Sequence, residues 1–224
     1  MAKEKQQLIQ SIRFPAYLLG FLWLIHSVQA LRGWQWSFLG VFPRETSGLI
    51  GILTGPLIHG SWEHLINNSL PVLILGAGIF YFFRNISWQV LIVSWISPGF
   101  ATWIAARPSF HIGISGVIYS LAFFVFFSGI FRKDVRSMTL SLLVAFWYGS
   151  MIWGVFPGKE GISWEGHLFG AITGIALAFY YRKAGPPKKK YSWEDEPESS
   201  PYDIIEPWNY KENMPPPEGF SYPE

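Results

Sequence analysis

The chain has 224 residues, of which 50% are hydrophobic, 18% are aromatic and only 14% are charged. Soluble domains carry about 25% charged residues, so this composition indicates a protein embedded in lipid. The net charge of +2 gives no reason to expect nucleic acid as a partner. Because the chain has no cysteine, disulfides, thiolate metal sites and cysteine nucleophiles are excluded.

Six stretches of the chain are apolar and approach the roughly 20 residues that a membrane-spanning helix needs. They are Phe14–Leu31, His64–Phe83, Trp88–Ala106, Ser115–Phe131, Met138–Phe156 and Gly166–Tyr181. Buried helices of a soluble bundle are the alternative, but these would show polar faces at helical period. Val90–Trp103 and Leu121–Phe131 contain no charged residue. We therefore predict an all-α, polytopic membrane protein built as a six-helix bundle.

The basic residues predict the orientation in the membrane, because cytoplasmic loops carry an excess of Lys and Arg. With the N-terminus inside, 12 basic residues fall on inner segments and 4 on outer segments, leaving out Lys211 far down the tail. The inner residues are Lys3, Lys5, Arg13, Arg84, Arg132, Lys133, Arg136, Arg182, Lys183, Lys188, Lys189 and Lys190, and the outer ones are Arg32, Arg44, Arg107 and Lys159. Both termini are therefore predicted to be cytoplasmic, and the second, fourth and sixth spans begin at the outer face.

Composition divides the chain into three parts. A polar N-terminal segment covers residues 1–13, the six-helix domain covers residues 14–181, and a tail covers residues 182–224. The tail starts with basic residues and continues with acidic residues and proline. Such a segment cannot bury enough apolar surface to fold alone, so we expect it to be disordered and solvated.

A long outer loop, Arg32–Glu63, joins the first two spans and mixes Trp and Phe with Gly and Pro. Aromatic side chains of this kind favour the membrane interface. We expect the loop to lie partly in that interface, with a short helix at Ser47–Thr54, and an ordinary packed loop is the alternative.

Ser115 stands at the centre of the small-residue turn Gly113-Ile114-Ser115-Gly116, where the fourth span begins. The first backbone N–H groups of a helix have no partner within the helix and lie at its positive end. A serine there is well placed as a nucleophile, but it needs a base within ~3 Å to take its proton.

His167 is the candidate base. It lies beside Gly166, Gly170 and Gly174, which recur every four residues and form one smooth helix face. Small residues at that spacing let two helix backbones approach closely. If this face meets the fourth span, His167 comes near Ser115, and Tyr119, one turn below Ser115, can buttress the imidazole. A helix–helix hydrogen bond is the alternative role for His167.

His64 and Asn68 are four residues apart at the start of the second span, so they share a helix face. Both side chains donate hydrogen bonds without a permanent charge. That suits an oxyanion hole, which the backbone N–H of Ser115 would complete. Each cluster alone is weak evidence, but all three are predicted at one depth near the outer face.

These residues together resemble the rhomboid family of intramembrane serine proteases. The resemblance covers residues 14–181 and is carried by Gly113-Ile114-Ser115-Gly116 with Tyr119, the glycine-flanked His167, and His64-x-x-x-Asn68. It implies that Ser115 is the nucleophile, His167 the general base and acid, and His64 and Asn68 the oxyanion donors. It further implies transmembrane protein substrates cut near the outer face, no metal or cofactor, and a place in a bacterial inner membrane. His59 matches another histidine often found in the family.

The first outer loop departs from the pattern of the family, and the family also implies a role for the fifth span. The first outer loop lacks the Trp-Arg pair of many members, and Phe42-Pro43-Arg44 stands there instead. The family implies a substrate gate at the fifth span, where Phe146, Trp147 and Tyr148 are candidates. Ordinary lipid-facing aromatics are the alternative for these three.

Other functions remain in competition. An inactive rhomboid-like member that binds or chaperones membrane proteins would lack Ser115 or His167, and this chain has both. A transporter would carry polar residues across the full membrane depth, and they are sparse in the inner half. A zinc protease would need His-Glu-x-x-His, which is absent. We expect Glu63 and Glu165 to stabilise helix starts. His26 and His111 are expected to be structural or interfacial, and contact with substrate is the alternative for His111.

Overall fold

The computed structural model describes residues 2–132, 139, 142, 143, 146, 152–157 and 163–184. The chain divides into two units, Met1–Pro186 and Pro187–Glu224, and all the described residues belong to the first. These residues form helices, and the only extended pairing among them is an isolated bridge between Val41 and His111. The all-helical class predicted from the sequence is confirmed for this part of the chain.

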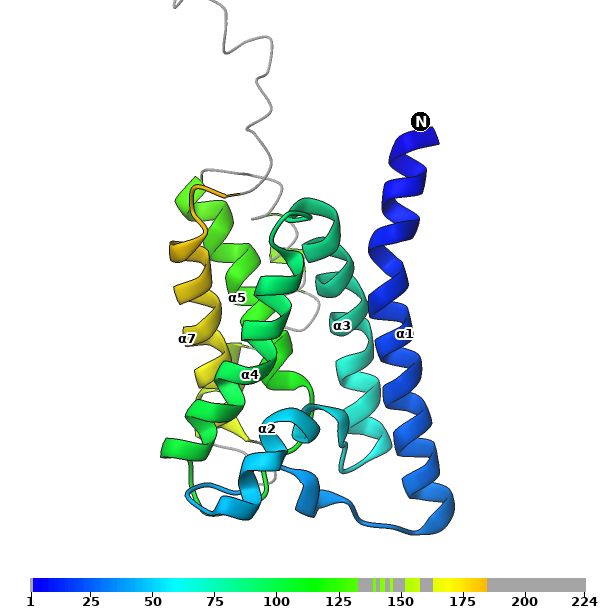
Figure 1. Ribbon diagram of the computed structural model, residues 1–224, viewed down its shortest axis with the longest axis vertical. Coiled ribbons are helices and arrows are strands. Elements are labelled where there is room, and N and C mark those ends of the chain that lie inside the picture. Colours follow the sequence, from blue (N-terminus) through cyan, green and yellow to red (C-terminus); the bar gives the residue numbers. More distant parts are fainter. Residues whose placement is uncertain are drawn as a thin grey trace, which may run out of the picture. The chain divides into compact units, whose positions relative to one another are not determined.

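Five long helices lie within the described residues (Figure 1). They are α1 (Ala2–Arg32), α3 (Trp62–Phe82), α4 (Ser87–Ala105), α5 (Ser115–Arg132) and α7 (Trp164–Tyr180). Helices α1, α3, α4 and α5 are long and apolar enough to cross a membrane, whereas α7 has 17 residues. The predicted fifth span, Met138–Phe156, falls partly outside the described residues. The count of six helices therefore stays a prediction.

The outer loop between α1 and α3 is a series of short helical turns. It contains η1 (Ser37–Leu39), η2 (Thr46–Ile50), α2 (Gly51–Thr54) and η3 (Gly55–Leu57), so the predicted short helix is confirmed. Arg44, with a φ of 64°, ties this loop to the end of α4. Its Nη1 donates to the Ala106 carbonyl at 2.9 Å, and its backbone N–H donates to the Trp103 carbonyl at 2.9 Å.

Local sequence signals set where the helices around the site begin. The Ser61 hydroxyl caps α3 by accepting the backbone N–H of His64 at 3.1 Å, and Glu63 lies in the first turn. Helix α4 ends just before the pair Arg107-Pro108. Gly113 then adopts a φ of 104°, which an L side chain rarely adopts, and this turn starts α5 at Ser115.

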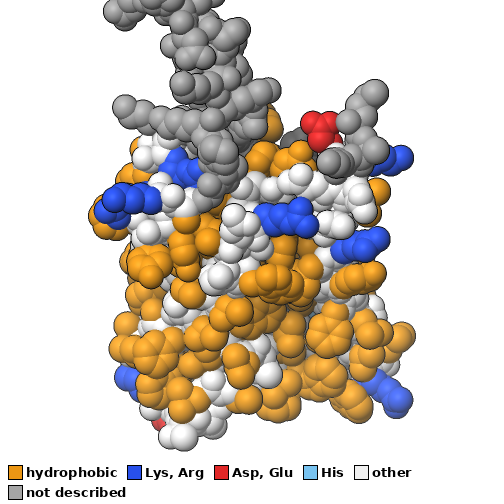
Figure 2. Space-filling model, turned by 45° about the horizontal axis from the view of Figure 1, so that its top comes forward, with side chains coloured by type: hydrophobic (Ala, Val, Ile, Leu, Met, Phe, Trp, Pro, Cys, Tyr) orange, Lys and Arg blue, Asp and Glu red, His pale blue; other side chains and the backbone are white. Residues whose placement is uncertain are grey.

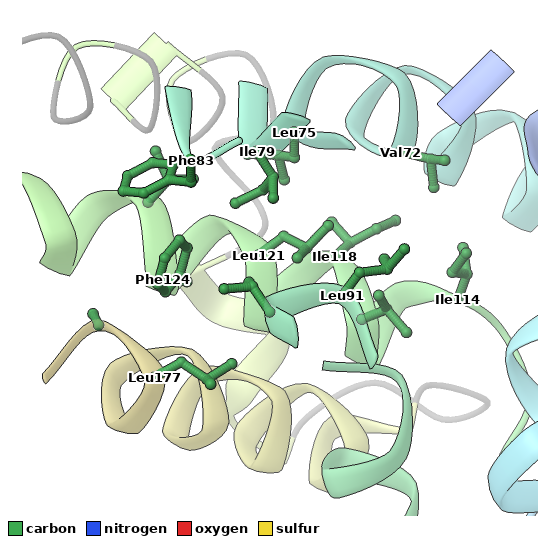
Figure 3. Close-up of a cluster of buried hydrophobic side chains, with 14 of the residues drawn as sticks. Val72, Leu75, Ile79, Phe83, Leu91, Ile114, Ile118, Leu121, Phe124 and Leu177 are labelled. Carbon is green, nitrogen blue, oxygen red and sulfur yellow. The ribbon is translucent and has the colours of Figure 1, made fainter. Parts of the chain in front are cut away.

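A cluster of buried side chains holds the helices together, and Figure 3 shows α3 facing α5 across it. The side chains shown there are Val72, Leu75 and Ile79 of α3 and Phe83 directly after it, opposite Ile118, Leu121 and Phe124 of α5, with Leu91 of α4 and Leu177 of α7 beside them. On the side of the molecule that Figure 2 shows, hydrophobic side chains form a broad belt, with Lys and Arg side chains gathered toward its two ends. In lipid, such helices associate through close packing and not through expulsion from water.

Helices α5 and α7 approach closely enough to require glycine. A Cβ atom added at Gly170 would clash with the carbonyl oxygen of Gly116, and one added at Gly174 would clash with the carbonyl oxygen of Ser120. The predicted meeting of the glycine face with the helix that Ser115 begins is confirmed. Because the opposing atoms belong to the backbone, no flexible side chain can move aside to make room for an added group.

The glycine contact predicts a specific loss of stability. Gly174→Ala should destabilise the protein by about 1–3 kcal/mol, because the new methyl group meets α5 backbone in a packed interface. The measurement is thermal unfolding in detergent. Gly20→Ala is the matched control, since Gly20 is helical, exposed and has nothing within 4 Å of an added Cβ. Equal melting temperatures for the two variants would contradict the prediction.

Candidate active site

Ser115 and His167 meet where α5 and α7 begin. The Oγ of Ser115 lies 2.7 Å from Nε2 of His167, although the residues are 52 positions apart. His167 Nδ1 lies 2.9 Å from the Gly154 carbonyl oxygen, on the 3₁₀ turn η4 (Ile152–Val155). A carbonyl only accepts, so the geometry assigns the ring proton to Nδ1. Nε2 is then free to accept the proton of Ser115.

Tyr119 holds the other side of the His167 ring. The two rings stack with their centroids 4.3 Å apart and their planes 10° from parallel. Gly154 closes the remaining space, because a Cβ atom there would clash with the Tyr119 hydroxyl and lie 3.1 Å from Nδ1 of His167. The imidazole is therefore fixed by a stacked ring, a backbone carbonyl and its own helix.

His64 and Asn68 lie on α3 at the same end of the bundle. The His64 ring packs against the turn that precedes Ser115, since a Cβ atom at Gly113 would lie 2.7 Å from its Nε2. Asn68 is buried, and its Nδ2 lies 3.2 Å from Nε2 of His59. This contact occupies one N–H of the Asn68 amide and leaves the second for another acceptor.

His59 is 1% exposed and supports Asn68 from the outer loop. Burial, reinforced by the neighbouring His64 and His26, lowers the pKa of His59 from 6.5 to about 3. His59 is therefore neutral near neutral pH and can accept the Asn68 amide through Nε2. The sequence singled out His59 only through the family resemblance, and the structure adds this contact.

A small cavity of about 50 Å³ lies behind Ser115. Thr102, His111 and Ser163 supply polar lining, and Trp95 and Pro98 supply apolar lining. Most of the lining is apolar, but a space of this size has room for a water molecule that the three polar side chains could bind. Within the described ranges, no three His, Asp or Glu side chains come together as a group that could hold a metal ion.

Two features of this site escaped the sequence reasoning. The Gly154 carbonyl contacts the candidate base, but a backbone acceptor on a glycine leaves no mark in a pattern of side chains. The second is the contact of 2.6 Å between His111 Nδ1 and the Ser163 hydroxyl, because the sequence gives no sign that these two residues meet. Phe146, one of the gate candidates, is helical and exposed, whereas Trp147 and Tyr148 lie outside the described residues.

Comparison with known proteins places these observations in a family. The model of the Rhomboid domain matches residues 46–184, which contain Ser115, His167, His64 and Asn68. The chain belongs to the rhomboid family. With its apolar helices, this makes it an integral, multi-pass membrane protein.

The similar relatives are mycobacterial. Uncharacterized proteins of Mycobacterium tuberculosis and Mycobacterium bovis are each 34% identical to this rhomboid-family chain over 193 residues. The alignment covers 76% of this chain and 78% of each relative. An uncharacterized protein of Mycobacterium leprae is 32% identical over 197 residues, covering 82% of this chain and 75% of the relative.

The buried His59 predicts that stability falls in acid. Its pKa in the folded protein, about 3, lies below its unfolded value of 6.5, so its contribution is present above pH 6.5 and is lost as the pH falls toward 3. The free energy of unfolding should fall by up to about 1.4 kcal/mol per pH unit in this range. Thermal unfolding in detergent between neutral pH and about pH 4.5 measures it.

His59→Gln supplies the control for this pH dependence, because its amide cannot titrate and can still accept from Asn68. The variant should lose less stability than the wild type over the same pH interval, whatever its stability at neutral pH. Equal losses in the two proteins would contradict the assignment.

Proposed function

We propose that this protein is an intramembrane serine endopeptidase that cleaves transmembrane protein substrates near the outer face of the membrane. The observation that carries the proposal is the contact of 2.7 Å between Ser115 Oγ and His167 Nε2. The Gly154 carbonyl supports it by holding the proton of His167 on Nδ1. This is the arrangement that a serine nucleophile and its general base require.

In the proposed reaction, Ser115 Oγ attacks the scissile carbonyl carbon and passes its proton to Nε2 of His167. The C–N bond then breaks, and His167 returns that proton to the leaving amine, which leaves an ester on Ser115. Water attacks the ester and passes a proton to His167. The bond between Ser115 Oγ and the acyl carbon then breaks, and His167 returns the proton to Oγ as the acid product leaves. The cavity behind Ser115 offers a place from which this water can come.

The negative charge on the substrate oxygen needs donors that are already in place. The backbone N–H of Ser115 lies in the first turn of α5 and so has no acceptor within that helix. We assign His64 and Asn68 as the side-chain donors, because they lie at this end of α3 and the His64 ring packs on Gly113. Losing one such donor typically costs ~10²–10³ in rate.

The topology belongs to the proposal as well. We place both termini in the cytoplasm of a bacterial cell with the protein in its inner membrane, so that α5 begins at the outer face. Residues 1–13 then form a cytoplasmic segment, residues 14–181 the six-helix domain, and residues 182–224 a cytoplasmic tail. Because helical backbone is shielded by its own hydrogen bonds, a substrate must unwind locally before it is cut. We expect preference for small or helix-destabilising residues near the outer interface.

The alternative is an inactive rhomboid-like protein that binds or chaperones membrane proteins. The two functions differ in what happens to Ser115. A protease activates this hydroxyl, and a serine-reactive fluorophosphonate should label it, whereas a binding protein has no need of an activated serine. The contact with His167 favours the protease.

Cleavage of a transmembrane substrate in liposomes tests the proposal. Ser115→Ala and His167→Ala should each reduce cleavage by at least about 10³-fold, because each removes one half of the unit that transfers the proton. Ser128→Ala, a buried serine further along α5, is the matched control and should cleave like the wild type.

Two results would count against this function. One is full cleavage by Ser115→Ala, which would place the chemistry elsewhere. The other is a cut that maps to the cytoplasmic half of the substrate helix, which would show that the proposed topology is wrong.

A further inference from the structure

The proposed mechanism gives no role to His111, although its side chain is buried close to Ser115 in the sequence. It is 6% exposed, four residues before Ser115, and its ring has partners on both nitrogens. Nδ1 lies 2.6 Å from the Ser163 hydroxyl, and Nε2 lies 3.1 Å from the Arg107 carbonyl oxygen. The first partner directly precedes α7, and the second lies in the segment that leads to Ser115.

The chemistry of these partners defines the state of the ring. Because the Arg107 carbonyl only accepts, Nε2 carries the proton and donates. Nδ1 is then the acceptor, and the Ser163 hydroxyl donates to it. Burial lowers the pKa of His111, with Arg107 and Glu165 as its charged neighbours, so the neutral ring is the form that matches both contacts.

Ser163 occupies the position that normally caps a helix, yet its hydroxyl does not cap α7. A capping serine stabilises a helix, and here that stabilisation is given up for the contact with His111. The carbonyl of Ser163 accepts the backbone N–H of His167 at 3.3 Å. Ser163 therefore connects His111 directly to the turn that carries the candidate base.

The backbone of His111 is held from the opposite side by the outer loop. His111 N–H donates to the Val41 carbonyl at 2.8 Å, and Val41 N–H donates to the His111 carbonyl at 2.9 Å. Two residues on, Gly113 N–H donates to the Gly55 carbonyl at 2.9 Å. The segment before Ser115 is thus fixed to the outer loop by its backbone and to α7 by the His111 side chain.

We propose that His111 is a positioning residue, whose bond to Ser163 sets how closely Ser115 approaches His167. The inference rests on the proposed protease function. A second tie acts in parallel, because the Glu165 carboxylate lies 3.5 Å from Arg107 Nε and 3.4 Å from the Arg107 backbone nitrogen. That tie joins α7 to the start of the same segment, whereas His111 holds the end nearer to Ser115.

The effect of losing this contact should appear in kcat. A shift of about 1 Å in a catalytic group costs up to about 10²-fold in rate. We therefore expect kcat to fall about 10- to 100-fold while KM stays close to the wild-type value, because the binding of the substrate helix does not depend on this bond.

Two substitutions of the same residue separate its two contacts. In His111→Asn the amide oxygen replaces Nδ1, so Ser163 keeps an acceptor. In His111→Gln the amide reaches the position of Nε2, so the contact with Arg107 is retained and the one with Ser163 is lost. We expect His111→Gln to show the loss in kcat and in the fluorophosphonate labelling rate, and His111→Asn to stay close to the wild type.

Ser163→Ala breaks the same bond from the α7 side and should reproduce the defect of His111→Gln. The double variant should be no slower than either single one, because both remove one interaction. Ser109→Ala is the control: Ser109 contacts His111 Nε2 at 3.4 Å but lies in the same segment as His111, so kcat should not change. If His111→Gln does not fold, Ser163→Ala decides the question alone.

The inference is overturned if His111→Gln and Ser163→Ala keep the wild-type kcat, or if His111→Asn is as slow as His111→Gln. It is also overturned if the loss follows the melting temperature across the variants, since the role is then purely structural. A wild-type protein that neither labels nor cleaves would instead show that the proposed function is wrong, and the inference would fall with it.

Discussion

The close approach of α5 and α7 determines where every other part of the site can lie. Ser115 and His167 belong to different helices, and the glycines of α7 bring them together by letting its backbone lie on that of α5. In lipid, where apolar surface gains nothing by leaving the solvent, backbone contact of this kind is what holds helices at a defined distance. A bulkier side chain at Gly170 or Gly174 would clash with the backbone of α5.

Neutral groups orient the candidate base. His167 Nδ1 contacts the Gly154 carbonyl, and Tyr119 stacks on the ring, so its tautomer and its plane are both fixed by neutral groups. A carboxylate in this place would stabilise a charged imidazolium more strongly, but an ionised group carries a large cost of burial in an apolar environment. A backbone carbonyl avoids that cost. Asn68 is likewise supported by a neutral group, the imidazole of His59.

Much of the arrangement could be predicted from side-chain patterns. Apolar stretches located α3, α4 and α5 to within a few residues, and the glycine spacing predicted a helix face that allows the close backbone approach seen between α7 and α5. The start of α1 differs because the polar residues before Phe14 are good helix formers, and a search for apolar stretches does not detect them.

The features that could not be predicted are those that depend on backbone atoms or on tertiary contact. The Gly154 carbonyl has no side chain to signal it, and the Arg44 contact with Ala106 joins residues far apart in the chain. The contact between His111 and Ser163 likewise joins residues that are far apart in the chain, and no spacing in the sequence pairs them. Spacing along one element reveals neighbours on that element, whereas these contacts arise between elements.

The central claim is that His167 activates the hydroxyl of Ser115. Treating the purified protein with a fluorophosphonate and mapping the modified peptide tests it most directly, because the probe reports the nucleophile without any assumption about the substrate. The account predicts that the adduct forms on Ser115 in the wild type and is lost in His167→Ala. An adduct on another serine, no adduct on Ser115, or equal labelling of Ser115 in His167→Ala would contradict it.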